Sequence, residues 1–80
     1  MRILDTNSDT AIKNIILYLK AEEAKELYDS IGALLKENDL KDHAHVDDAA
    51  FEHEVTVVLY DERQVELLNE RSKEIILKDM

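Results

Sequence analysis

Four stretches of the chain have the apolar pattern of β-strands. The two longest, residues 12–19 (IKNIILYL) and residues 51–60 (FEHEVTVVLY), are rich in β-branched and aliphatic side chains. Residues 43–47 (HAHVD) alternate polar and apolar positions, which predicts a short strand. The opening residues 1–5 (MRILD) are also apolar in part. We expect them to form an edge strand that pairs with the first long one.

Two other stretches have the apolar spacing of a helix. Residues 21–38 carry apolar side chains three and four positions apart, which places them along one stripe. The stripe consists of Ala24, Leu27, Tyr28, Ile31, Leu34 and Leu35. Residues 61–78 have the same spacing, and Asp61 followed by Gln64 resembles a capping box at the start of a helix. The second stripe consists of Val65, Leu68, Ile75 and Ile76, with Leu67 beside it.

The order of these elements predicts an α+β fold of the type ββαββα, or βαββα if residues 1–5 form no strand. Each helix must bury its apolar stripe, and the sheet is the surface available for that. We therefore expect a two-layer sandwich, in which two helices cover one face of a mostly antiparallel sheet of three or four strands. A chain of 80 residues predicts a single domain, residues 1–80. The two strand–helix units also align in pattern, which indicates a pseudo-repeat of residues 1–40 and 41–80.

Such a sandwich leaves the second face of the sheet uncovered. Strand alternation places Ile16, Tyr18, Val58 and Tyr60 on this open face. A half-apolar patch with tyrosines is typical of surfaces that associate with other proteins. We expect these four residues to contact a protein partner or a second copy in a homodimer. The alternative is that they are scattered exposed apolar residues, which are normal on any protein surface.

Composition narrows the class of partner. Hydrophobic residues make up 45% of the chain and charged residues 36%, a balance typical of folded domains. The net charge of -9, from 19 acidic and 10 basic residues, disfavours binding to nucleic acid or to an anionic membrane surface. No long apolar run predicts a signal peptide or a transmembrane helix, so we expect a cytoplasmic protein. A basic protein partner is compatible with this charge.

Several kinds of chemistry are excluded by the absence of particular residues. The chain has no cysteine, which excludes disulfides, thiolate zinc sites and a cysteine nucleophile. It has no proline and one glycine, whereas glycine-rich phosphate loops and the nucleophile elbow need several glycines at fixed positions. No catalytic residue and no cofactor are predicted, and we expect a protein that is not an enzyme.

The three histidines are the remaining candidates for chemistry. His43, His45 and Asp47 are two positions apart and would share one face of a strand, a spacing that suits metal ligands. In an antiparallel hairpin, however, parity places His53 on the other face, toward the core, unless a β-bulge intervenes. The residues expected opposite His43 and His45 are Glu52, Glu54 and Thr56. The three histidines therefore do not form one cluster, and cross-strand polar pairs are the expected role of the first two.

Two functional hypotheses follow. The first is a small acidic domain without catalytic activity that acts by protein–protein contact, as an inhibitor or immunity-type protein or as a homodimer. It rests on size and charge. The alternative is a metal-binding protein or metal-dependent enzyme that uses His43 and His45 with Asp47 or Glu54.

Overall fold

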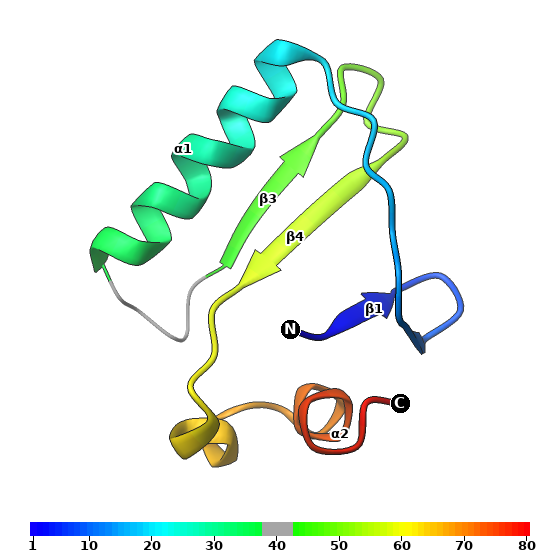
Figure 1. The fold of residues 1–80 in the computed structure, drawn as a ribbon, viewed down its shortest axis with the longest axis vertical. Coiled ribbons are helices and arrows are strands. Elements are labelled where there is room, and N and C mark those ends of the chain that lie inside the picture. Colours follow the sequence, from blue (N-terminus) through cyan, green and yellow to red (C-terminus); the bar gives the residue numbers. More distant parts are fainter. Residues whose placement is uncertain (38–42) are drawn as a thin grey trace. The chain divides into compact units, whose positions relative to one another are not determined.

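The computed structural model describes residues 1–37 and 43–80. The chain forms two compact units. We call Tyr18–Tyr60 the central unit, and Met1–Leu17 together with Asp61–Met80 the terminal unit. Each unit contains one antiparallel pair of strands and at least one helical segment, which confirms the predicted α+β content (Figure 1).

The central unit consists of helix α1 (Ala21–Glu37) and the strands β3 (His43–Asp47) and β4 (Glu54–Val58). α1 lies beside β3, and β4 lies on the other side of β3 (Figure 1). Glu22 and Glu23 occupy the first turn of α1, where carboxylates favour the positive end of the helix dipole. The helix predicted at residues 21–38 and the strand predicted at residues 43–47 are confirmed. The strand predicted at residues 51–60 is shorter than expected, because β4 covers only Glu54–Val58.

The β3–β4 hairpin separates its side chains into two faces. Ala44 pairs with Val57, and Val46 pairs with Val55. Val46 is buried and the other three are half-buried, whereas most of the residues between them are exposed. Leu34 of α1 is also buried. The apolar face of the hairpin therefore packs toward α1, as its alternating pattern predicts.

The terminal unit consists of the strands β1 (Ile3–Asp5) and β2 (Thr10–Ile12), the short 3-10 helix η1 (Glu62–Leu67) and helix α2 (Glu70–Lys78). The opening residues therefore do form a strand. β1 and β2 pair in the antiparallel register that the short turn between them allows.

The strand predicted at residues 12–19 is wrong. Only Ile12 of that stretch lies in a strand, and residues 13–20 lie outside helices and strands. Ile12 pairs with Ile3, which is the first residue of the three-residue strand β1. β1 therefore offers no further partner, and an apolar run without a neighbouring strand has no ladder of hydrogen bonds to join.

The single sheet of three or four strands is not confirmed. The described residues contain two sheets of two strands each, β1–β2 and β3–β4. α1 belongs to the central unit and α2 to the terminal unit, so the structure does not show two helices on one face of one sheet. The pseudo-repeat of residues 1–40 and 41–80 stays a prediction.

The second helix, predicted over residues 61–78, is divided into η1 and α2. Asn69 lies between them with an extended backbone, and its Oδ1 accepts a hydrogen bond from the backbone N–H of Ser72 at 2.8 Å. Asparagine is a poor interior residue and a strong N-cap, so it starts a new helix here. Asp61 is therefore the N-cap of the short helix η1, and not of the single long helix that was predicted.

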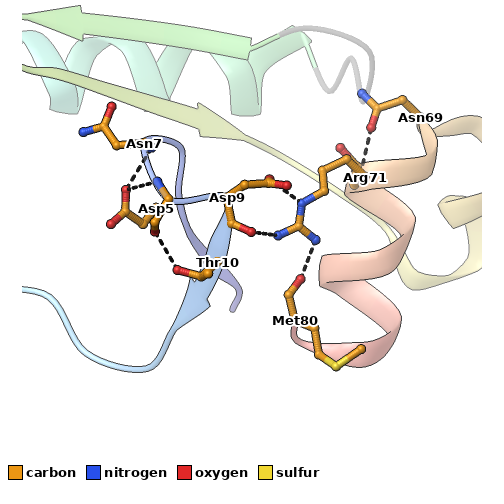
Figure 2. Close-up of polar contacts among 9 residues, drawn as sticks. Asp5, Asn7, Asp9, Thr10, Asn69, Arg71 and Met80 are labelled. Carbon is orange, nitrogen blue, oxygen red and sulfur yellow. Dashed lines mark hydrogen bonds and ion pairs between the residues drawn. The ribbon is translucent and has the colours of Figure 1, made fainter.

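Polar contacts join the β1–β2 hairpin to α2 in the terminal unit. The guanidinium of Arg71 donates through Nε to Asp9 Oδ1 at 2.7 Å and through Nη2 to the Asp9 carbonyl at 3.0 Å (Figure 2). Nη1 donates to the carbonyl of Met80. Asp9 itself has a positive φ of 55°, a conformation more common for aspartate than for most residues. One side chain thus holds the hairpin turn, the helix and the end of the chain.

A second polar contact lies nearby in the same unit. Arg2 Nε donates to the carbonyl of Ile76 at 3.1 Å. The carboxylate of Asp79 accepts from Lys13 and lies 3.9 Å from Arg2 Nε. The bond from Lys13 lowers the pKa of Asp79. These contacts attach both strands of the hairpin region to the last turn of α2.

The apolar core of each unit is small. The buried apolar side chains among residues 1–37 and 43–80 are Leu34, Val46, Val65 and Ile75. Two belong to each unit, and no polar or charged residue among the described residues is buried. Stability must therefore come from these few side chains, from half-buried neighbours and from the polar contacts described above.

We predict that Arg71→Ala destabilises the protein by about 1 kcal/mol, because it removes the two bonds that join the hairpin turn to α2 and the bond to the Met80 carbonyl. This corresponds to a melting temperature about 4–8 °C lower for a domain of this size. Arg63→Ala is the control. It removes the same charge, but its side chain is 88% exposed and, among the described residues, bonds to Asp61, two positions away in the sequence. Equal shifts in thermal unfolding for the two variants would contradict the role of Arg71.

Candidate functional site

The outer face of the β3–β4 hairpin carries the first two histidines. His45 lies directly opposite Thr56, and His43 lies opposite Val58. His45 Nδ1 is 2.9 Å from Thr56 Oγ1 and 3.3 Å from Glu54 Oε1. The rings of the two histidines meet edge to face, with centroids 4.6 Å apart. The predicted cross-strand neighbours Thr56 and Glu54 are confirmed for His45, whereas the prediction is wrong for His43, because the register places Val58 opposite it.

Two carboxylates face each other at the loop end of the same face. Asp47 pairs directly with Glu54. Partial burial and the hydrogen bond to Glu54 raise the pKa of Asp47. Hydrogen bonds from Thr56 and Asp47 lower the pKa of Glu54. Of the two carboxylates, Asp47 is therefore the one that is protonated first as the pH falls.

The predicted metal ligands share a face but do not form a metal site. His43, His45 and Asp47 all lie on β3, as alternation requires. In the part of the chain that the structure describes, no group of three or more histidine, cysteine or acidic side chains is arranged to hold a metal ion. The geometry thus gives the metal hypothesis no support.

His53 lies in the loop before β4, not at the edge of the core. Its side chain is 81% exposed, and its Nδ1 lies 2.5 Å from Asp48 Oδ2. Asp48 Oδ1 also accepts backbone N–H groups from Glu52 at 2.8 Å and from His53 at 3.3 Å. β4 begins at Glu54, so strand parity does not extend to His53 and the prediction of its core-side position is wrong.

The bond between Asp48 and His53 changes the pKa of both groups. It raises the pKa of His53 above the ordinary 6.5 and lowers the pKa of Asp48. The loop also holds Phe51 at a φ of 55°, with its ring exposed. A positive φ is unfavourable for a bulky residue, and the bonds of Asp48 across the loop offset part of this cost.

Helix α1 has an apolar surface that the hairpin does not cover. Leu27, Ile31 and Leu34 are half-buried or buried, but Tyr28 and Leu35 are 77% and 62% exposed. Successive residues on a helix point about 100° apart, so two adjacent residues cannot both face a narrow hairpin. The predicted single stripe therefore divides into a covered part and an open part, a division that the adjacent pairs LY and LL in the sequence already imply.

The open part of α1 forms a shallow groove. Its volume is about 360 Å³, and it is lined by Tyr28, Asp29, Ile31, Gly32 and Leu35. A Cβ placed on Gly32 would meet no atom within 4 Å. Packing among the residues that the structure describes therefore does not require a glycine at position 32. We call Ala24, Tyr28, Gly32 and Leu35 the open stripe of α1.

Of the four residues predicted to form an interaction surface, Ile16, Tyr18 and Val58 are exposed and Tyr60 is half-buried. Ile16 and Tyr18 lie in the segment without regular structure, Val58 ends β4, and Tyr60 follows it. Val58 does share the outer face with His43, as predicted. Ile16 belongs to the terminal unit and the other three to the central unit. Their joint use as one surface stays a prediction.

Comparison with known proteins finds no matching family model, no similar curated protein and no similar solved structure. Within residues 1–37 and 43–80, no helix has both the length and the apolar composition needed to cross a membrane. The function must therefore be argued from the surfaces described above.

We predict that the pKa of His53, measured by NMR titration, lies above 6.5 and that Asp48→Asn lowers it toward that value. The asparagine oxygen can still accept the loop N–H groups, so the loop should keep its shape. Glu52→Gln is the control and should change the pKa less, because Glu52 contributes less than Asp48.

The same bond predicts a pH-dependent stability. Because the pKa of His53 is raised on folding, its contribution is complete below pH 6.5 and is lost as the pH rises through the folded-state pKa. The lowered pKa of Asp48 makes its contribution complete above pH 3.8, with loss as the pH falls through the folded-state pKa. A His53 pKa at or below 6.5 would contradict the bond.

Proposed function

We propose that the chain is a small acidic protein-interaction domain without catalytic activity of its own. The observation that carries this proposal is the imbalance between its buried and exposed apolar side chains. Four apolar residues are buried among the described residues, whereas large apolar side chains such as Tyr18, Tyr28 and Leu35 are exposed. Contiguous exposed apolar surface on a small domain is typical of a protein-binding site.

The charge of the chain indicates the kind of partner. The net charge of -9 favours a protein whose binding surface has a basic rim, since complementary charge accelerates encounter and selects the partner. An inhibitor or immunity-type role, in which an acidic protein covers a basic patch of its target, fits this balance. The contacts proposed for such a partner are Ile16, Tyr18, Val58 and Tyr60.

We predict that the purified protein, covalently cross-linked in a lysate of its native host, captures a defined protein at near-equal stoichiometry. Tyr18→Glu combined with Tyr60→Glu should reduce the capture about tenfold or more, because buried tyrosines commonly contribute over 1 kcal/mol to binding. Thr6→Glu is the control, since it adds a negative charge at an exposed polar position in the β1–β2 turn.

Circular dichroism must show that all variants remain folded. Capture that is unchanged in the double tyrosine variant would contradict the proposed contacts. The absence of both a captured protein and self-association would contradict the proposed function itself.

A further inference from the structure

The open stripe of α1 is the most specific unassigned surface in the described residues. It combines exposed Tyr28 and Leu35 with the single glycine of the chain, Gly32, in one groove. Glycine in a helix interior costs about 1 kcal/mol relative to alanine. No atom of residues 1–37 and 43–80 lies close enough to require it. A close approach by another backbone would explain why a residue without a side chain lies between two large apolar ones.

We propose that the open stripe of α1 binds the open stripe of a second copy of the chain, with the two helices antiparallel and crossing at Gly32. This inference rests on the proposed interaction function and names one partner for it. A twofold axis through the crossing point makes the interface self-complementary, as in most homodimers. The missing side chain at Gly32 allows the two helix axes to approach closely.

The apolar residues are complementary in this arrangement. With Gly32 opposite itself, a residue before Gly32 in one copy lies at the level of a residue equally far after it in the other. Helix rise places Tyr28 about 6 Å before Gly32 and Leu35 about 4.5 Å after it. Tyr28 of one copy therefore packs beside Leu35 of the other, and the reciprocal contact follows from symmetry.

The charged residues beside the stripe are complementary only in the antiparallel orientation. Asp29 and Lys36 are seven positions apart, so they lie on the same flank of α1, within about 20° of each other. Antiparallel pairing brings Asp29 of one copy within about 1.5 Å of the level of Lys36 of the other. Parallel pairing, about a twofold axis along the helices, would place this flank of the two copies on opposite sides of the interface, so Asp29 of one copy would not meet Lys36 of the other.

These two ion pairs act against the repulsion between copies that each carry a net charge of -9. Within one copy, Asp29 bonds to Lys25 at 3.0 Å on the same exposed flank. Its carboxylate is 57% exposed and retains room for a second cation. The proposed contact is limited to one face of a single helix, whereas a stable interface takes roughly 800 Å² per partner, so the dimer should be weak.

Sedimentation velocity over roughly 10–500 µM of the whole protein tests this proposal. We expect the sedimentation coefficient to rise from monomer to dimer with a dissociation constant on the order of 100 µM. Gly32→Leu should abolish the rise, because its side chain would fill the crossing point. In a single copy that side chain enters open space and helix propensity improves, so circular dichroism should show a folded protein.

A charge swap tests the orientation. Asp29→Lys and Lys36→Asp should each weaken the dimer about threefold or more, because each creates two like-charge pairs across the interface. The double variant should restore association, since the two charges exchange places. Glu26→Lys is the matched control for Asp29→Lys, because Glu26 is exposed on a different face of α1, and it should not weaken the dimer.

Three results would overturn the proposal: a monomer at all concentrations, undiminished association of Gly32→Leu, or no recovery in the double variant. If the protein is monomeric but still captures a host protein through Tyr18 and Tyr60, only the dimer is wrong. If it is monomeric and captures nothing, the proposed function fails as well.

Discussion

The apolar face of helix α1 is wider than the two-stranded hairpin that covers it. Leu27 and Leu34 face the hairpin, while the next residues in sequence, Tyr28 and Leu35, point about 100° away and remain exposed. A third strand beside β3–β4 would widen the covering surface, but the described residues contain two separate pairs of strands. The proposed role in protein–protein contact follows from this mismatch in width.

The terminal unit is stabilised in a different way. Its buried apolar residues are Val65 and Ile75, one on η1 and one on α2. The hairpin is attached to α2 chiefly through charged side chains, with Arg71 at its centre (Figure 2). Charge-assisted bonds with fixed geometry specify one arrangement even where little apolar surface is available. They also explain how a hairpin of three-residue strands persists, since an isolated hairpin of this length is marginal in water.

Sequence reasoning predicted the central unit better than the terminal unit. Helix α1 and the parity of the β3–β4 hairpin follow from clear apolar periods, and parity correctly placed His45 beside Thr56. The predicted strand at residues 12–19 was wrong because a strand needs a partner strand to pair with. The pairing of β2 with β1 ends at Ile12, so the residues after it have no partner in β1. A local apolar pattern does not contain that information.

Two other wrong predictions, the unbroken second helix and the position of His53, depended on single polar residues. The spacing of apolar residues gives no information about them. Asn69 interrupts a continuous helical pattern because its side chain caps α2. His53 does not lie at the edge of the core, where it was predicted, because its ring bonds to Asp48 within the loop. Among the candidate sites, the outer hairpin face was predictable from alternation, whereas the open stripe of α1 required knowing how few strands α1 packs against.

The open stripe can be tested most directly by NMR on the tyrosine ring and leucine and valine methyl signals over a dilution series. The account predicts that signals of Tyr28 and Leu35 shift with protein concentration, while those of Leu34 and Val46 in the core do not. Signals of Tyr28 and Leu35 that stay constant up to the highest concentration would contradict the account.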